Sequence, residues 1–343
     1  MTKRITIEDV ANQAGVSKST VSQYLNERFD YMGEKTRMKI EKVIKELDYQ
    51  PNVIARSLKK KSTSTIGVIV ANILHAYSTQ VIRAIENVCN ENGISTIICN
   101  ADDDSEKEKN YLETLLSKQI DGLIVIPTSG NLEMYNKLIS ENFPLVFLDR
   151  IVDGLDSDTV LLDNKKASEL AVDCLYENGH EKIAIVTTSL IDNVTPRVER
   201  IQGYKEALKK RHIQINQEYI KGAELSLIKQ KLTELFTLSE PPTAIISGND
   251  LTLMEILSYT FDNGIKIGKD IGLITVDEVS FAAIHTPPLT TIVQPTIDMG
   301  TKAAEILLEK INNKQTKNKP TIYRYDPSLI VRGSVERVGD RID

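Results

Sequence analysis

From residue 65 onward, short apolar runs alternate with longer amphipathic segments, and this alternation limits the fold more than any other feature of the chain. The runs are rich in Val and Ile and are short enough for strands; they cover 66–70, 95–100, 122–127, 145–149, 182–186, 244–247 and 271–276. Between the first of them, helices are expected over 78–92 and 105–118. Continuous apolar strands joined by helices are typical of a parallel sheet. The sequence therefore predicts an α/β body, whose two βα blocks of similar size form two lobes around a cleft.

The first 50 residues have the pattern of a small helical module. Thr6 and Asp9 are spaced as in a helix-capping box, and Gly15 can end this first helix. Ser17 can cap the next one; the second and third helices are expected over 18–26 and 34–47. Two short helices joined by a turn with glycine form a helix-turn-helix, whose second helix enters the major groove of DNA. An ordinary three-helix bundle without a DNA role is the alternative.

Charge separates this module from the rest of the chain. Residues 1–63 hold 13 Lys and Arg against 8 Asp and Glu, a balance of +5, and the remainder holds 29 against 40 (42 less 13, and 48 less 8), a balance of −11. A basic module on an acidic body indicates that only the first part meets a polyanion. A segment with one Pro and a run of lysines, followed by Ser and Thr, predicts a hinge and linker over 51–64, and 336–343 form a charged tail.

Several sequence stretches closely resemble the LacI/GalR family of transcription regulators. The headpiece and hinge of that family are similar to TIEDVANQAGVSKSTVSQYLN (6–26) and EKTRMKIEKVIKELDYQPNVIARSLKKK (34–61). The body has family-like segments at PLVFLDR (144–150), GHEKIAIVT (179–187), RIQGY (200–204), SGND (247–250) and PPLTTIVQP (287–295). The resemblance covers nearly the whole chain. It implies a helix-turn-helix headpiece over 1–50, a periplasmic-binding-protein-like core of two α/β lobes over 65–335, and a repressor controlled by a small molecule.

The resemblance also implies which residues contact DNA. In the headpiece these are Thr6, Ser17, Lys18, Ser19, Ser22, Gln23 and Asn26, and in the hinge they are Asn52, Ala55, Arg56 and Leu58. In the family, a Leu from each hinge is wedged into the minor groove, and Leu58 stands at the matching place. Many members have Arg where this chain has Gln23. Because Arg favours guanine and Gln favours adenine, the outer bases of the operator are expected to differ from the family norm.

The resemblance implies that the effector lies between the lobes, at strand ends. The residues that match effector contacts of the family are Asp149, Arg200, Asn249 and Asp277, and the second-tier candidates are Asn72, His75 and Gln294. Their hydrogen-bonding groups suit a polyol, so the effector is expected to be a sugar, and the extra cation Arg197 favours a sugar acid. A purely structural role is the alternative, since an Asp at a strand end often caps the next helix. The usual aromatic residues of an effector pocket are not evident, and the chain has no Trp.

Other functional classes have less support in the sequence. No GxGxxG follows a strand, no GxxxxGK[ST] occurs, and Cys89, Cys99, Cys174 and the four His show no metal-ligand spacing, so no cofactor or metal is expected. A transport-associated sugar-binding protein would need an export signal, and an enzyme would need a catalytic constellation that is not evident. A regulator with a protein corepressor stays open. The sequence thus predicts a cytoplasmic homodimer that binds a near-palindromic operator, has no membrane span and is not an enzyme.

Overall fold

The computed structural model of the 343-residue chain describes residues 5–30, 32–49, 62–191, 194–313 and 319–336. The chain divides into two compact units, one ending at Thr63 and the other starting at Ser64. Among the described residues, no helix has the length and apolar character needed to cross a membrane.

The first unit is a bundle of three helices, α1 (Ile7–Ala14), α2 (Lys18–Leu25) and α3 (Glu34–Glu46). The predicted capping box starts α1, because Thr6 Oγ1 accepts from the Asp9 amide and Asp9 accepts from the Thr6 amide at 2.8 Å. Gly15 ends the helix with a φ of 60°, which glycine adopts readily. Apolar side chains from all three helices form the core, and these are Val10, Ala11, Ala14, Val21, Ile40 and Val43, with Tyr49. The predicted helix-turn-helix is therefore formed by α1 and α2.

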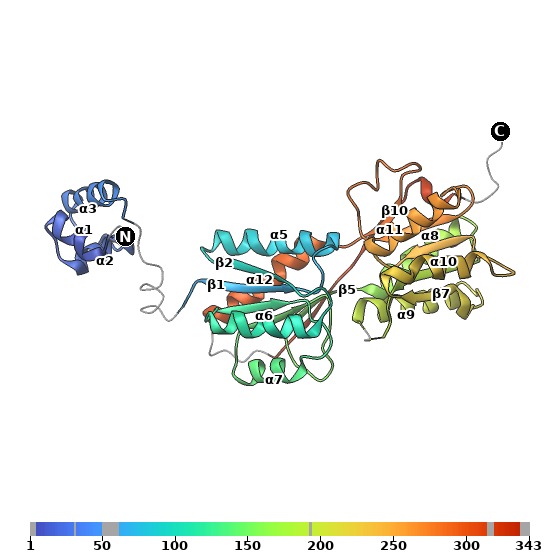
Figure 1. Cartoon of the computed structure of the whole chain (residues 1–343), viewed down its shortest axis with the longest axis horizontal. Coiled ribbons are helices and arrows are strands. Elements are labelled where there is room, and N and C mark those ends of the chain that lie inside the picture. Colours follow the sequence, from blue (N-terminus) through green and yellow to red (C-terminus); the bar gives the residue numbers. More distant parts are fainter. Residues whose placement is uncertain (1–4, 31, 50–61, 192–193, 314–318, 337–343) are drawn as a thin grey trace. The chain divides into compact units, whose positions relative to one another are not determined.

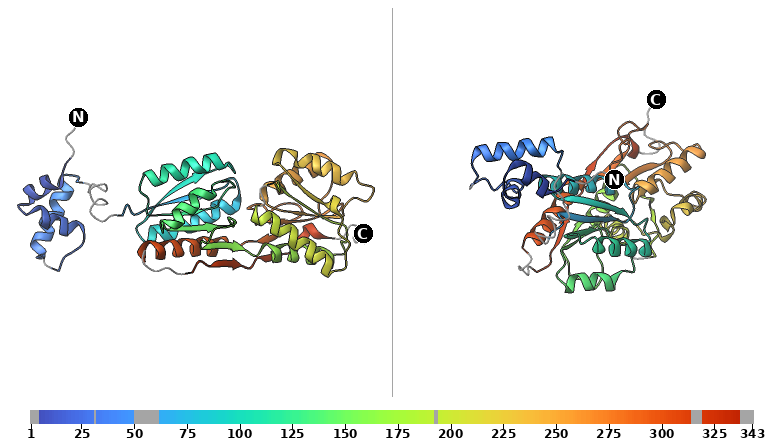
Figure 2. Two further views of the ribbon diagram at one scale, coloured as in Figure 1. Left: turned by 90° about the horizontal axis from the view of Figure 1, so that it is seen from below. Right: turned by 60° about the vertical axis from the view of Figure 1, so that its left-hand side comes forward.

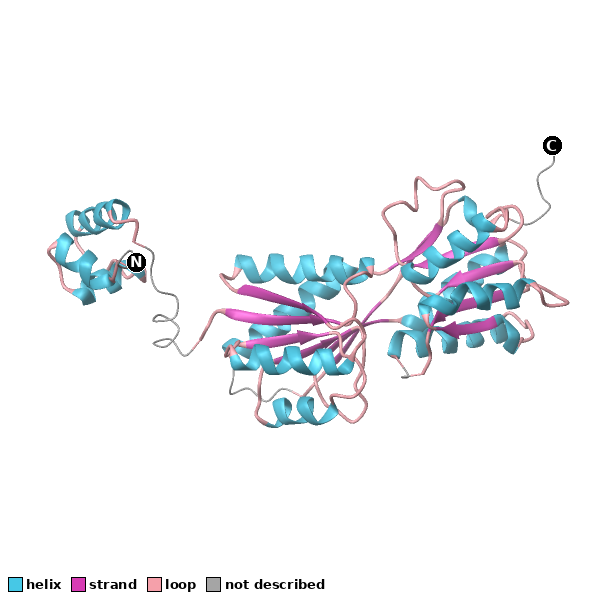
Figure 3. Cartoon of the chain, viewed as in Figure 1, coloured by secondary structure: helices cyan, strands magenta, loops and turns pink. Residues whose placement is uncertain are grey.

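The second unit contains two six-stranded sheets, one in each lobe. In the N-lobe the strand order is β11-β5-β4-β3-β1-β2, and the strands are β1 (Thr65–Val70), β2 (Ser95–Asn100), β3 (Gly122–Val125), β4 (Leu145–Leu148), β5 (Thr159–Leu162) and β11 (Ile322–Tyr325). All pairs in this sheet are parallel. Its helices are α5 (Ala76–Glu91), α6 (Ser105–Ser117), α7 (Leu132–Ser140) and α12 (Thr296–Asn312). They cover both faces of the sheet (Figure 3), as its apolar strands require.

The C-lobe has the strand order β12-β10-β9-β8-β6-β7. Its strands are β6 (Ile183–Thr188), β7 (Ile220–Ala223), β8 (Ala244–Ser247), β9 (Gly272–Val276), β10 (Thr290–Val293) and β12 (Ser328–Ile330). Its helices are α8 (Asn164–Glu177), α9 (Thr195–Lys210), α10 (Ile228–Phe236) and α11 (Asp250–Asp262), with 3₁₀ turns at Gln217–Tyr219, Leu225–Leu227 and Gly333–Val335. The parallel sheet predicted from the sequence is found, except that β12 pairs antiparallel with β10.

The two lobes are not two consecutive halves of the chain. After β10 the chain returns to the N-lobe, where α12 packs against α5 and the strands β3, β4 and β5. The strand β11 then joins the N-lobe sheet before the chain crosses again to β12 (Figures 1 and 2). Three segments therefore connect the lobes, after β5, after β10 and after β11. These three connections hold the two lobes beside each other and still allow hinge motion between them.

The boundaries of several predicted elements shift by one or two residues. The helix predicted over 78–92 is α5, which begins at Ala76, so that Tyr77 and Ser78 lie in its first turn. The helix predicted over 18–26 ends at Leu25, and Asn26 caps it with its side-chain amide on the Ser22 carbonyl at 2.6 Å. The strands β5, β7, β10, β11 and β12 were not predicted as separate elements, because their apolar runs are short.

Candidate functional site

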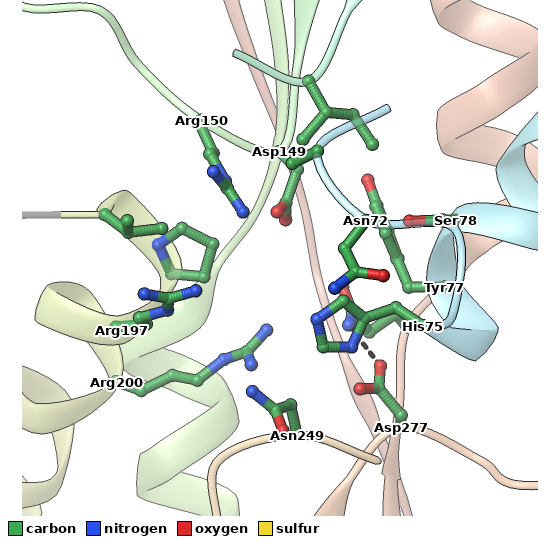
Figure 4. Close-up of a pocket in the computed structure, with 15 residues that line it drawn as sticks. Asn72, His75, Tyr77, Ser78, Asp149, Arg150, Arg197, Arg200, Asn249 and Asp277 are labelled. Carbon is green, nitrogen blue, oxygen red and sulfur yellow. Dashed lines mark hydrogen bonds between the residues drawn. The ribbon is translucent and has the colours of Figure 1, made fainter. Parts of the chain in front are cut away.

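A pocket lies between the lobes, at the carboxyl ends of the strands of both sheets. The empty space between its lining residues is about 500 Å³, part of which is open to solvent. All eight residues predicted to contact an effector line it, with seven others: Ala71, Asn72, His75, Tyr77, Ser78, Ile126, Asp149, Arg150, Val194, Pro196, Arg197, Arg200, Asn249, Asp277 and Gln294 (Figure 4). Open α/β sheets bind ligands at this edge. The geometry thus brings the predicted residues together, and their role in binding stays a prediction.

Two carboxylates enter the pocket from equivalent places in the two lobes. Asp149 follows β4 and Asp277 follows β9, and their φ angles are 66° and 86°, a left-handed conformation that is uncommon outside glycine. Such backbone strain concentrates at functional sites. Burial raises the pKa of Asp149 against the opposing charge of nearby arginines, and burial followed by the charge of Asp250 raises the pKa of Asp277. A carboxylate oxygen at these places can accept hydrogen bonds from hydroxyl groups.

Asp277 is held by two neighbours at the floor of the pocket. The side-chain amide of Gln294 donates to one carboxylate oxygen at 2.5 Å, and the backbone amide of Asp250 donates to the other at 3.3 Å. Asn249 caps α11 through its Oδ1, which accepts from the Thr252 amide at 2.8 Å, while its Nδ2 lies 3.3 Å from Thr188 Oγ1. Asn249 thus has the structural capping role that was the alternative to a ligand contact. It also lines the pocket.

Two arginines on the first turns of α9 face the pocket from the C-lobe. Arg200 is buried, and its Nε donates to Asn164 Oδ1 at 2.9 Å and one terminal nitrogen to the Gly248 carbonyl. Arg197 is partly buried and donates to the Ser189 carbonyl at 2.8 Å. Neither guanidinium has a carboxylate within ion-pair distance among the described residues. The sequence spacing of three residues puts both on one side of the helix.

Arg150, which the sequence analysis did not single out, faces the same space from the N-lobe. Its terminal nitrogens donate to the Pro127 carbonyl at 3.1 Å and to Asp103 Oδ1 at 2.8 Å. The loop after β3 that carries Pro127 is fixed by Glu108, a fully buried residue of α6. Glu108 accepts from the Thr128 amide at 2.6 Å, and from two side chains, Asn131 Nδ2 at 2.7 Å and Tyr135 Oη at 2.6 Å.

The lobes are joined beside the pocket by direct hydrogen bonds. Asp250 of the C-lobe accepts from the Ala76 amide at 2.6 Å, and its other oxygen lies 2.5 Å from His75 Nδ1 at the start of α5. The Ile151 amide of the N-lobe donates to Thr195 Oγ1 of α9 at 2.9 Å. Because these bonds cross the cleft, a ligand that changes the distance between the lobes must strain or break them.

Of the seven lining residues that were not predicted from the sequence, Tyr77, Ser78 and Arg150 carry polar groups. Tyr77 is an aromatic residue of the lining that was not evident from the sequence, and its side chain is buried. The Oη of Tyr77, the Nε of Arg150 and the Oε1 of Gln294 are buried without a hydrogen-bond partner among the described residues. Buried polar atoms of this kind are rare in folded proteins and call for a ligand or a water molecule. The sequence carries no local signal for Tyr77, because α5 begins at Ala76 without a capping side chain.

Four of the residues predicted to contact DNA lie on α2. Lys18, Ser19 and Gln23 are exposed, and Ser22 is half-buried. The side chains of Lys18 and Gln23 make no hydrogen bond or ion pair with another described residue. The Ser17 hydroxyl caps α2 at 3.1 Å from the Thr20 amide and also lies 2.6 Å from Ser19 Oγ. Thr6 caps α1 through its hydroxyl. The hinge residues Asn52, Ala55, Arg56 and Leu58 lie outside the described residues.

Comparison with protein families identifies both units. Residues 6–52 match the model of bacterial regulatory proteins of the lacI family, and residues 172–335 match a periplasmic binding protein-like domain. The probable HTH-type transcriptional regulator EndR of Paenibacillus polymyxa is 45% identical over 333 residues, which are 96% of this chain and 98% of EndR. The chain belongs to the LacI family. It is therefore a DNA-binding transcription regulator, and the expectation that it is not an enzyme is confirmed by its relatives.

Other members of the LacI family match over the same length. The HTH-type transcriptional repressor PurR of Aliivibrio salmonicida is 33% identical over 97% of this chain and 99% of its own. Among solved structures, the lac repressor dimer bound to operator and the anti-inducer ONPF superposes with a TM-score of 0.83 at 25% identity, covering 97% of this chain and all of that one. The predicted fold, a helix-turn-helix headpiece with a two-lobed periplasmic-binding-protein-like core, is confirmed.

Proposed function

We propose that this LacI-family regulator is a repressor controlled by a sugar or sugar acid that binds between the two lobes. The observation that carries the proposal is the pocket itself, where polar side chains from both lobes converge on one space. Asp149, Asp277 and Asn249 offer acceptors and a donor for hydroxyl groups, and Arg197 and Arg200 offer donor forks. A ligand rich in hydroxyl groups can satisfy many of these side chains at once.

The composition of the lining favours a polyol over a flat heterocyclic base. A base of that kind is normally held by stacking on aromatic rings. Among the residues that line the pocket, Tyr77 is the one Phe, Tyr or Trp, and ten other lining residues are polar or charged, His75 among them. The lining therefore favours hydrogen-bonded recognition of hydroxyl groups, as expected for a sugar.

The proposal is tested by the effect of candidate ligands on thermal unfolding and on operator binding. A sugar or sugar acid that binds the pocket raises the melting temperature of the protein by mass action and changes its affinity for operator DNA. Asp277→Ala should weaken this response by about 1–3 kcal/mol or more, since it leaves Gln294 and the ligand unpaired, while DNA binding without ligand persists. An unchanged response in Asp277→Ala would remove that residue from the ligand site. Stabilisation by purine bases alone would overturn the sugar assignment.

We further propose that the protein binds a near-palindromic operator as a homodimer formed through its second unit. A two-fold operator requires two headpieces. The lac repressor, which matches over nearly the whole chain, is a dimer on its operator. Met254 and Phe261, seven residues apart on α11, are 51% and 87% exposed, and Ile284 is 81% exposed. Burial of these apolar side chains against a second copy would stabilise the dimer. Light scattering at micromolar concentration distinguishes this state from a monomer.

At the DNA, Gln23→Ala should lose about 1–3 kcal/mol of specific binding and relax discrimination at one base pair in each half-site. The reason is that Gln23 is exposed on α2, is free of other partners and can pair with adenine through both of its amide atoms. The measurement is a gel-shift titration on operator variants at fixed salt. Glu27→Ala, an exposed change just beyond the helix, is the control. If Gln23→Ala keeps the ratio of specific to random binding, the assignment fails.

A further inference from the structure

Two guanidinium groups approach the pocket from opposite lobes. Arg150 follows β4 in the N-lobe, and Arg197 lies on the first turn of α9 in the C-lobe. Burial, followed by the nearby positive charge of Arg150, lowers the pKa of Arg197, and the charge of Asp103 only partly offsets this. Figure 4 shows both groups on one side of the pocket, with Arg200 beside them. Two like charges thus face each other across the cleft.

The two guanidiniums have fewer partners than buried cations normally find. Arg150 makes one ion pair, with Asp103 at 2.8 Å, and its Nε is buried without a hydrogen-bond partner among the described residues. Arg197 has the Ser189 carbonyl at 2.8 Å and no ion pair with any residue that the structure describes. Buried charges are ordinarily paired or fully hydrogen-bonded. Among the described residues the two guanidiniums thus have one ion pair, that of Arg150 with Asp103, and an anion bound between them would give Arg197 a partner as well.

We propose that the effector carries a carboxylate, which binds between Arg150 and Arg197 and joins the two lobes. The proposal rests on the proposed function, that is, on the pocket as the effector site. A carboxylate matches the donor fork of a guanidinium, and bidentate pairing gives strong and oriented binding. The hydroxyl groups of the effector then lie toward Asp277, which is on the opposite side of the pocket from Arg150 and Arg197 (Figure 4). The carboxylate of Asp277 disfavours a second anionic group at that end, so charge sets the orientation of the ligand.

The same arrangement predicts that a bound carboxylate draws the two lobes together. Without an anion the two guanidiniums repel each other, and this repulsion opposes the approach of the lobes. A bound carboxylate attracts both groups and reverses the sign of this interaction. A neutral sugar leaves the repulsion in place. The charge of the effector therefore acts on the distance between the lobes as well as on affinity.

The test compares ligand pairs that differ only in an acid group replacing an alcohol, namely D-glucuronate with D-glucose, D-galacturonate with D-galactose, and D-gluconate with sorbitol. Affinities are measured by calorimetry and thermal shift on the full-length protein, at two salt concentrations. The expected result is that the acid of at least one pair binds roughly tenfold to a hundredfold more tightly than its neutral partner, as a charge-assisted hydrogen bond would give.

Arg197→Gln should remove most of this preference for the acid, and Arg197→Lys should keep the charge but lose part of the preference with the donor fork. Arg211→Gln makes the same change of charge at a surface ion pair with Asp173 and should leave the preference intact. Tighter or equal binding of the neutral partners would overturn the carboxylate assignment and keep the sugar-binding pocket. A preference for the acid that survives in Arg197→Gln would overturn the role of Arg197. Binding of no member of any pair would overturn both the inference and the proposed function.

Discussion

Gly203→Val is expected to lower the free energy of unfolding of the C-lobe by about 3 kcal/mol or more, because two helix backbones meet at this residue. A Cβ at Gly203 of α9 would lie 2.5 Å from both the Cα and the carbonyl oxygen of Lys165 in α8, so the helices must move apart. Overpacking of this kind costs about 1–3 kcal/mol. The movement also stretches the 2.9 Å bond from Arg200 to Asn164, and a bond to a charged group contributes about 1.5–3 kcal/mol.

The measurement is urea unfolding followed by circular dichroism, with Lys209→Val as the matched control. Lys209 is exposed on the last turn of the same helix, so its replacement introduces the same β-branched residue without a clash and should cost only a few tenths of a kcal/mol. Because α9 carries Arg197 and Arg200, the Gly203 variant should also lose ligand affinity while its headpiece still binds DNA. Equal stability of the two variants would show that α8 and α9 do not need this close contact.

The sequence predicts the parts of the site that depend on local order along the chain. Asp149 and Asp277 directly follow apolar strands, and Asn249 begins a helix after another strand, so a parallel α/β fold places them at one edge without knowledge of long-range contacts. The family resemblance adds Arg200 on α9. The helix-turn-helix is predictable for the same reason, since the caps at Thr6 and Ser17 and the turn at Gly15 are local features.

What the sequence does not show depends on contacts between distant segments. Tyr77 was missed because the start of α5 carries no capping side chain, and the helix begins two residues earlier than its pattern indicates. The return of α12 and β11 to the N-lobe joins residues more than 150 positions apart, as in the pairing of β11 with β5. In the sequence, Asp250 is only an acidic residue in the first turn of α11. The fold places its carboxylate against the backbone amide of Ala76, 174 residues away.

Asp250→Ala is expected to have the second large effect, because this one side chain makes two bonds between the lobes. Its carboxylate and the His75 ring are 8% and 17% exposed, so the pair is shielded from water. Removing one partner of a buried ion pair costs about 3–5 kcal/mol, since the other partner is left uncompensated. Here both His75 and the Ala76 amide lose their acceptor. Reduced interlobe stability should appear as faster hydrogen exchange at the Ala76 amide and as a lower free energy of unfolding.

The size of this effect should depend on pH in a defined direction. Burial disfavours the charged form of His75, but the hydrogen bond and charge of Asp250 outweigh it and raise the pKa of His75. Burial also opposes ionisation of Asp250, yet the bonds from His75, Ala76 and Leu251 lower its pKa. A raised histidine pKa gives stability that is fully present below the unfolded value of about 6.5 and is lost as pH rises through the folded value. A lowered aspartate pKa gives stability that is present above about 3.9 and is lost as pH falls.

His75 and Asp250 are therefore both charged between about pH 4 and pH 6.5. In alkaline solution His75 loses its proton and the ion pair is lost. The difference in free energy of unfolding between wild type and Asp250→Ala should be largest near pH 5.5 and clearly smaller at pH 9. Thr195→Val is the matched control, because it removes another bond between the lobes, from the Ile151 amide, without involving a group that titrates. Its cost of about 1 kcal/mol should be the same at both pH values. A pH-independent effect of Asp250→Ala would mean that His75 stays neutral and that the contact acts as an ordinary hydrogen bond.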